Sequence, residues 1–177
     1  MARPLPTDYA PSFARYIDQV QGDDPLTALK EQEPKIAVML NSFTEENSNY
    51  AYAPGKWSIK MLWQHIIDGE RIFCYRALCI ARGETQGLPG FEEDDYAALS
   101  GADERSWESI VQEMKNVRRS TIELFQSFTP DMLARVGTSN GKSITPNALG
   151  FILAGHIMHH MEVIRERYLP GIKTGNS

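Results

Sequence analysis

The sequence predicts an all-α fold: a four-helix bundle with a long crossover connection between its second and third helices, in a single domain over residues 1–177. Four stretches, each of about 20 residues, carry apolar side chains at the three- and four-residue spacing of a buried helix face. Alternating apolar and polar residues are scarce, and we find no convincing strand. The connection 84–105 is long enough to cross the bundle, so the helices that it joins can run parallel.

The first two long helices have clear start signals. The stretch 24–43 begins with Asp24 as a candidate N-cap, and a proline follows at the first helical position. The stretch 57–83 begins with Ser58 as its N-cap and ends at a glycine. It is apolar around much of its circumference, which predicts a largely buried helix. A short helix over 8–20 is expected to precede both.

The second half of the chain continues the helical pattern. Ser106 caps a third helix over 106–128, which carries an apolar stripe, and the segment 129–133 is a short capped turn. Thr145 then caps the last helix, which opens with a proline and runs to about Leu169. These four long helices are the predicted bundle.

Composition and charge narrow the class of protein. Apolar residues make up 42% and charged residues 23%, which is ordinary for a soluble globular domain. The net charge of -5 and the pI of 5.4 argue against a nucleic-acid-binding surface. No apolar run reaches the roughly 18 residues of a membrane span, and no signal peptide is evident. The only cysteines, Cys74 and Cys79, point about 140° apart on one helix. We interpret them as packed thiols of a cytoplasmic protein.

Three of the four histidines lie in the last predicted helix, within "GHIMHHMEVIRERYL". His156 and His160 are four residues apart, so their side chains lie on the same face, one turn apart along the axis. The rest of their stripe is apolar, which predicts that both face the bundle interior. His159 lies about 100° around the helix from His160 and is expected to border the site or to face outward.

The fourth histidine, His65, lies on an inward stripe of the second long helix, with Asp68 one turn further on. Neutral imidazoles that are buried side by side need polar partners for their nitrogens. One divalent metal ion satisfies three ring nitrogens at once, and three nitrogen ligands with open positions are typical of catalytic sites. Each histidine alone is also compatible with a packed, metal-free core residue. Asp68 is expected to lie beside the metal ligands, to be an extra ligand itself, or to accept a hydrogen bond from another side chain.

Three segments together, in this order, resemble a known family: "KWSIKMLWQHIIDGERIFCYRALCIARG", "LPGFEEDDYA" and "LGFILAGHIMHHMEVIRERYL". They are similar to the DinB-like superfamily of bacterial four-helix bundles, and the resemblance covers roughly residues 10 to 170. It implies metal ligands at His65, His156 and His160, with nickel, zinc or another divalent transition metal. It also implies a long crossover, frequent homodimers and, in some relatives, transferase or isomerase reactions that use a low-molecular-weight thiol.

We therefore predict a metal-dependent enzyme with a three-histidine site at His65, His156 and His160, most simply for nickel or zinc, with iron or manganese as other candidates. The ion would activate a thiol cosubstrate or water for a transferase-, isomerase- or hydrolase-like reaction on a small molecule. The alternatives are a metal- or ligand-binding bundle without turnover and a purely structural bundle. Further residues expected near the site are Asp68 and His159 beside the ligands and Trp63, Phe91 and Tyr96 as pocket walls.

Overall fold

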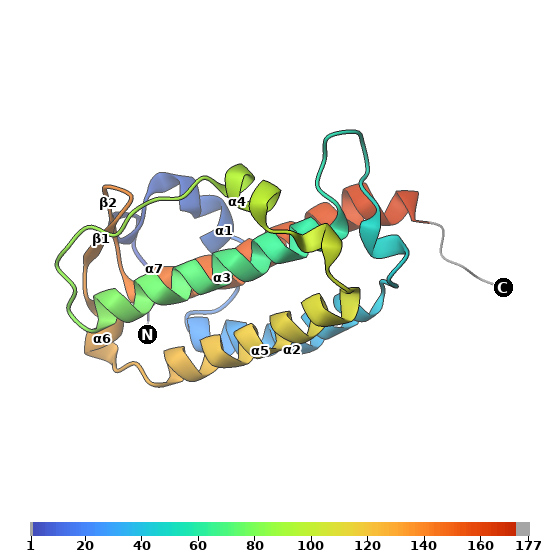
Figure 1. Cartoon of the computed structure of the whole chain (residues 1–177). Helices are drawn as coiled ribbons and strands as arrows, with labels where there is room; N and C mark the ends of the chain where they lie inside the picture. Colours follow the sequence, from blue (N-terminus) through green and yellow to red (C-terminus); the bar gives the residue numbers. More distant parts are fainter. Residues whose placement is uncertain (1, 173–177) are drawn as a thin grey trace.

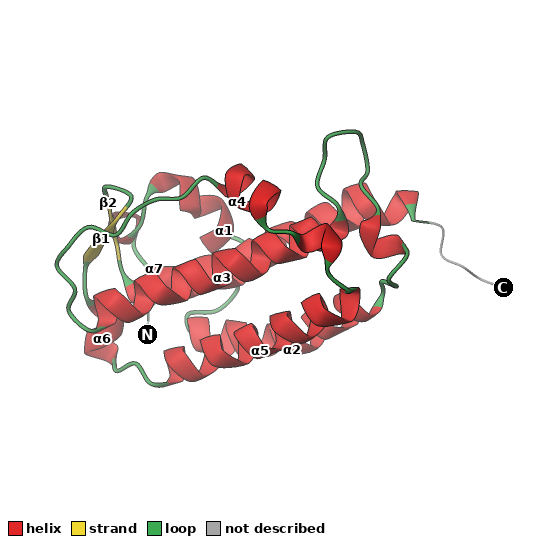
Figure 2. Ribbon diagram, in the orientation of Figure 1, coloured by secondary structure: helices red, strands yellow, loops and turns green. Residues whose placement is uncertain are grey.

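Helices make up most of the computed structural model, which describes residues 2–172 (Figures 1 and 2). The helices are α1 (Ala14–Ile17), α2 (Pro25–Asn41), α3 (Ile59–Ala81), α4 (Glu93–Leu99), α5 (Trp107–Gln126), α6 (Pro130–Ala134) and α7 (Pro146–Val163). A π-helical turn, Ile164–Tyr168, extends α7, and Gly137–Ser139 and Lys142–Ile144 form the strands β1 and β2. The four longest helices, α2, α3, α5 and α7, form the predicted bundle.

The order of the bundle follows from the crossover connection. Helices α3 and α5 run in the same direction, while α2 and α7 run in the opposite one (Figure 1). Residues 82–106 therefore return along the length of α3 before α5 begins, and α4 lies in this return. The predicted crossover is confirmed, and it places a covering segment over one side of α3.

Side-chain caps fix where the helices begin. The side chains of Asp24, Ser58, Ser106, Thr129 and Thr145 each accept a hydrogen bond from the backbone N–H three residues further on. Such caps satisfy backbone donors that have no partner within the helix. Each of these residues was predicted to cap or to open its segment, so the helix starts are set by local chemistry.

The expectation that the chain has no convincing strand is wrong for residues 137–144. Strands β1 and β2 pair antiparallel around Asn140 and Gly141, whose φ angles of 49° and 69° are those of a tight hairpin turn. Each strand has only three residues, too few for an alternating pattern to stand out. Leu88 of the crossover pairs with this hairpin, since its N–H donates to Thr138 O and its carbonyl accepts from Asn140 N, both at 2.9 Å. The hairpin thus holds the start of the crossover in place.

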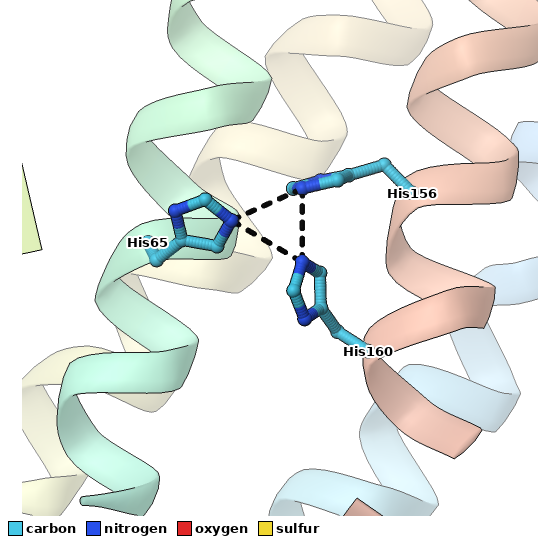
Figure 3. A group of neighbouring side chains, drawn as sticks. All are labelled: His65, His156 and His160. Atoms are coloured by element: carbon cyan, nitrogen blue, oxygen red, sulfur yellow. Dashed lines mark hydrogen bonds between the residues drawn. The ribbon is translucent and has the colours of Figure 1, made fainter. Parts of the chain in front are cut away.

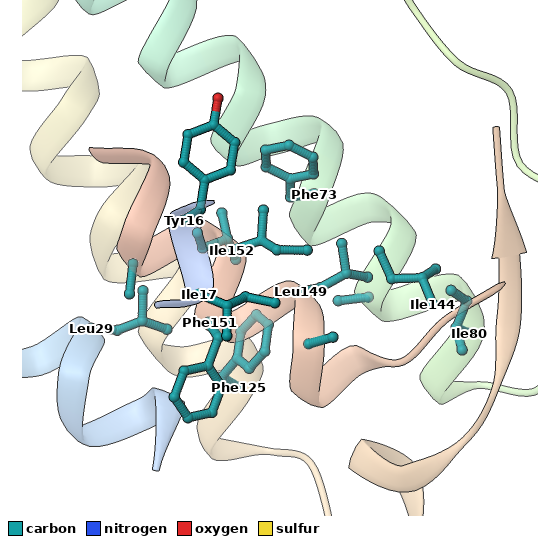
Figure 4. Packing of buried hydrophobic residues seen from close by; sticks show 14 of the residues in the cluster. Tyr16, Ile17, Leu29, Phe73, Ile80, Phe125, Ile144, Leu149, Phe151 and Ile152 are labelled. Carbon is teal, nitrogen blue, oxygen red and sulfur yellow. The ribbon is translucent and has the colours of Figure 1, made fainter. Parts of the chain in front are cut away.

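The hydrophobic core is divided into two clusters along the bundle. One packs α1 and the C-terminal half of α3 against the N-terminal half of α7 (Figure 4). The other occupies the opposite end of the bundle, where the N-terminal half of α3 meets the C-terminal half of α7. Polar side chains therefore lie in the layer between the two clusters.

One part of this middle layer is a hydrogen-bond network among all four long helices. Gln32 Nε2 of α2 donates to Ala154 O of α7 at 2.8 Å, and Arg118 Nη1 of α5 donates to Gln32 Oε1 at 3.1 Å. Arg118 Nη2 also pairs with Glu70 Oε2 of α3 at 2.8 Å, and the Thr121 hydroxyl donates to Glu70 Oε1 at 2.7 Å. Because these groups pair with one another, they hold the bundle together across its middle.

Among residues 2–172, none of the helices is both long enough and apolar enough to span a lipid bilayer.

Candidate metal centre

Helices α3 and α7 bring three histidines together in the middle layer. His65 lies on α3, and His156 and His160 lie one turn apart on α7. The close approach of the two helices depends on Gly69 of α3, because a Cβ atom at this position would lie 3.2 Å from His156 Cε1. On the other side of α7, Gly155 contacts the backbone of α1 at Tyr16. Glycines on both sides of the site thus allow tight packing around the imidazoles.

The three imidazoles point their Nε2 atoms toward one another (Figure 3). His65 Nε2 lies 3.2 Å from His156 Nε2 and 3.2 Å from His160 Nε2, and the latter two are 3.0 Å apart. His65 and His156 are only 7% and 6% exposed. The three rings form the one group of ligand-type side chains in residues 2–172 that lies close enough to hold a common ion.

The protonation state favours cation binding. Burial lowers the pKa of His65 to about 4 and that of His160 to about 3. Burial and the neighbouring imidazoles also hold the pKa of His156 well below its usual range. All three rings are therefore neutral near pH 7. A single N–H···N hydrogen bond pairs only two of the three nitrogens, so at least one lone pair still faces another nitrogen.

The nitrogen separations fit one divalent transition-metal ion held by all three rings. With metal–nitrogen distances of about 2.1 Å, neighbouring ligands lie about 3.4 Å apart in tetrahedral geometry and about 3.0 Å apart in octahedral geometry. The observed separations of 3.0–3.2 Å between the Nε2 atoms lie between these two values. Neutral imidazole is a good ligand for zinc, nickel and iron. A three-nitrogen set leaves positions for water or substrate.

Aromatic side chains surround the triad and limit its contact with water. The Trp57 ring is tilted against His65 with 5.0 Å between centroids. The rings of Tyr16 and Phe73 are nearly perpendicular to that of His156, at 5.4 and 5.9 Å between centroids. These contacts fix the planes of the rings. None of these three aromatic residues is among those that the sequence predicts near the site.

Asp68 and His159, which were expected beside the ligands, lie outside the triad. Asp68 is half-buried and accepts a hydrogen bond from Gln64 Nε2 at 2.9 Å. Its negative charge acts on His65 by raising the pKa of that imidazole, against the larger effect of burial. His159 packs against the rings of Tyr16 and His160, at 5.6 and 5.1 Å between centroids.

Of the three residues that were expected to line the pocket, only one does so. Trp63 is 0% exposed and belongs to the hydrophobic core, where it lines neither of the two cavities beside the triad. The reason is helical geometry, since a residue two positions before His65 points about 200° away from it. Phe91 does line a cavity beside the triad, whereas Tyr96 is 50% exposed and packs on the outside of Phe91.

Two cavities approach the triad. The larger, of about 350 Å³, is lined by His65 and His156, and the smaller, of about 240 Å³, by His160. Consecutive residues at the start of α4 separate them, because Glu93 lines the larger cavity and Asp94 the smaller. Both residues are exposed, although they border the cavities.

The larger cavity extends along α3 away from the triad. Phe73 and Arg76 line it together with Gly69, and Phe91 covers it from the crossover. Arg76 lies 11 residues after His65, which is only about 20° around the helix, so helical spacing alone could have indicated it. Tyr16 and Trp57 come from segments outside the long helices, and no spacing in the sequence relates them to His65.

The family is decided by a sequence comparison. The sequence model of the DinB superfamily matches residues 28–164, which is well over half of the chain. The chain belongs to the DinB superfamily. A search of functionally curated proteins found no match.

Solved structures support the same fold for this DinB-superfamily chain. YfiT from Bacillus subtilis, described as a probable metal-dependent hydrolase with an unusual four-helix bundle topology, is 18% identical with a TM-score of 0.66. The match covers 92% of this chain and 91% of YfiT. The DinB-like protein YjoA from Bacillus subtilis is 16% identical with a TM-score of 0.60, over 86% of this chain and 94% of YjoA.

A third structure of the same fold is a mycothiol-dependent maleylpyruvate isomerase, which is 11% identical with a TM-score of 0.63. The match covers 77% of this chain but only 58% of the isomerase, so that protein has a large part without a counterpart in the match. At these identities the three structures establish the fold of the chain and nothing finer about its chemistry.

Proposed function

We propose that the protein is a metal-dependent enzyme in which His65, His156 and His160 bind one divalent transition-metal ion, and in which a thiol cosubstrate or water attacks a small-molecule substrate. The observation that carries this proposal is the convergence of three neutral, largely buried Nε2 atoms within 3.0–3.2 Å of one another. A bound divalent ion lowers the pKa of a coordinated thiol or water and so supplies the nucleophile at neutral pH. Nickel and zinc suit this ligand set best, with iron and manganese as further candidates.

The protein's own cysteines do not fit the role of nucleophile. Cys74 and Cys79 lie nine and 14 residues beyond His65 on α3, which is about 14 and 21 Å along the helix axis. Burial raises the pKa of Cys74 to about 12, so its thiol is protonated at neutral pH. A thiolate for this site would therefore come from a low-molecular-weight thiol.

The two cavities favour a reaction with two small molecules. The larger meets the triad at His65 and His156 and the smaller at His160, with the start of α4 between them. A thiol in one cavity and an electrophile in the other would both reach the triad. Aromatic rings around the histidines keep bulk water away, which protects a thiolate from competition by solvent. We further propose, from the family resemblance, that the enzyme is a cytoplasmic homodimer.

The test combines metal analysis with activity. Protein purified without a histidine tag and reconstituted with nickel, zinc, iron or manganese should hold about one equivalent of metal. Its rate with a panel of electrophiles and low-molecular-weight thiols, or with hydrolysable esters and amides, should depend on that metal. His160→Gln should lose metal and activity together. His159→Gln, the same change at the preceding position, should keep both.

Two outcomes would replace the proposal with its alternatives. Less than about a tenth of an equivalent of every metal after reconstitution would leave a structural bundle with packed histidines. Full occupancy without any rate above that of the free thiol or buffer would leave a metal-binding module without turnover. Sedimentation of the purified protein would check the dimer separately.

A further inference from the structure

Arg76 lies at the far end of the larger cavity, and it is a buried cation without an acidic partner among the residues that the structure describes. The residue is only 6% exposed, and its guanidinium lies between two aromatic rings, 5.8 Å from the Phe73 centroid and 5.7 Å from the Phe91 centroid. Its one hydrogen bond within the described chain is from Nη2 to Pro89 O, at 2.7 Å. Among residues 2–172, no carboxylate lies within ion-pair distance of it.

The other buried arginine of the bundle shows what a structural cation looks like here. Arg118 pairs with Glu70 at 2.8 Å and also donates to Gln32, so its charge is neutralised inside the protein. An unpaired buried charge is costly, and burial accordingly lowers the pKa of Arg76. Packing alone does not require a guanidinium at this position, because an apolar chain of the same length would fill the space between the two rings.

The position of Arg76 relative to the triad defines a binding site with two ends. The Phe73 ring lies 5.9 Å from the His156 ring and 5.8 Å from the Arg76 guanidinium carbon, which together place that carbon within about 12 Å of the imidazole. Between the two ends the cavity is bordered by Gly69, which leaves space, and by Phe73 and Phe91, which are apolar. Exposed Arg15 and Lys142 at the rim outnumber the one acid there, Glu93.

We propose that Arg76 binds a carboxylate of the substrate, and that the enzyme therefore acts on molecules in which an apolar segment separates this carboxylate from the reacting atom. One unpaired cation matches one negative charge, which favours a carboxylate over a doubly charged phosphate. The flat guanidinium, held between two rings, suits a planar anion. Nη2 is engaged by Pro89, which leaves the other N–H groups for the ligand. The part of this proposal that places the reacting atom at the histidine triad rests on the proposed function. Binding of a carboxylate at Arg76 can be tested without turnover.

The test compares 3-phenylpropionate with its uncharged analogue 3-phenylpropanamide. Both are titrated into the isotope-labelled full-length protein, as purified and again after treatment with EDTA, and amide chemical shifts are followed by NMR. The acid should bind at least about tenfold more tightly than the amide in both forms. The shifts should be largest around Phe73, Phe91 and Arg76. A preference that survives removal of metal separates this site from direct coordination of the acid by an ion.

Three variants assign the preference to Arg76. In Arg76→Met the acid and the amide should bind within about twofold of each other, while Arg76→Lys should keep part of the preference. Arg82→Met, which changes an exposed arginine directly after α3 and outside the cavity, should behave like wild type. Equal binding of acid and amide to the wild type, no binding of the acid, or an undiminished preference in Arg76→Met would each overturn the proposal.

The wild-type comparison also covers the case in which Arg76→Met does not fold. The preference for the acid should then weaken as salt is raised from 50 to 500 mM, with the affected amides still around Phe73 and Phe91. Affected amides elsewhere in the chain would refute the assignment. Loss of metal or of turnover, with the preference for the acid intact, would count against the proposed function and not against this site.

Discussion

Acid should destabilise the metal-free protein strongly, because its buried histidines resist protonation in the folded state. The pKa values of about 4 for His65 and about 3 for His160, and the low pKa of His156, all lie below the usual 6.5 of an unfolded chain. As the pH falls below 6.5, protons therefore bind the unfolded state first, and stability is lost down to the folded pKa values. At pH 5, His65 and His160 each contribute a loss of about 2 kcal/mol relative to pH 8, or about 4 kcal/mol together. His156 adds to this loss because its pKa is also lowered.

Urea denaturation at a series of pH values between 8 and 5, in excess EDTA, measures this effect. Most carboxylates stay ionised over this range, so the histidines dominate the change. Near pH 5.5 the slope of the unfolding free energy against pH should correspond to between two and three protons, or about 3–4 kcal/mol per pH unit. This slope is large against a typical stability of about 5–15 kcal/mol. His160→Gln should reduce the loss by about 2 kcal/mol, whatever its stability at pH 8. A total loss below about 2 kcal/mol, or an equal loss in wild type and His160→Gln, would refute the description of three buried neutral rings.

Three further predictions concern packing, the buried ion pair and thiol reactivity. Gly155→Ala would place a Cβ atom 2.0 Å from a backbone oxygen of α1, so thermal denaturation should show a loss of about 2–3 kcal/mol. Glu70→Met should cost about 3–5 kcal/mol because it leaves Arg118 buried and unpaired, and the double variant with Arg118→Met should cost less than Glu70→Met alone. With a pKa of about 12, the Cys74 thiol in a Cys79→Ser background should react with Ellman's reagent far more slowly in folded than in urea-denatured protein.

Much of the fold could be predicted because the helix boundaries are local. Capping residues such as Ser58 and Thr145 act on donors within three residues, and the apolar stripes that follow report burial of one face. The hairpin at 137–144 was missed because its strands are too short to show a period, although Asn140–Gly141 was a usable turn signal. Long connections such as 84–105 leave the path of the chain unspecified, so only the crossover itself could be predicted.

In the candidate site, too, local features could be predicted from the sequence and tertiary contacts could not. His156 and His160 lie four residues apart on one helix, so they share a face of it. His65 lies on the inward face of another helix, so the meeting of the three side chains could be predicted. The surroundings could not, because Tyr16 and Trp57 reach the histidines through tertiary packing. The prediction that Trp63 lines the pocket is wrong for a reason visible in the sequence. Trp63 lies two positions before His65 on a helix, so its side chain points to nearly the opposite side.

The middle layer of the bundle contains two kinds of buried polar group, and the difference between them separates structure from function. Gln32, Arg118 and Glu70 pair with one another, so the charges of Arg118 and Glu70 are matched within the chain. Two members of the histidine triad, His65 and His156, border the same cavity as Arg76. Neither the triad nor Arg76 finds its natural partner, a cation or an anion, among residues 2–172. Folding alone would favour apolar replacements at those positions. Their retention next to open volume is what binding of a metal ion at one end and a carboxylate at the other would require.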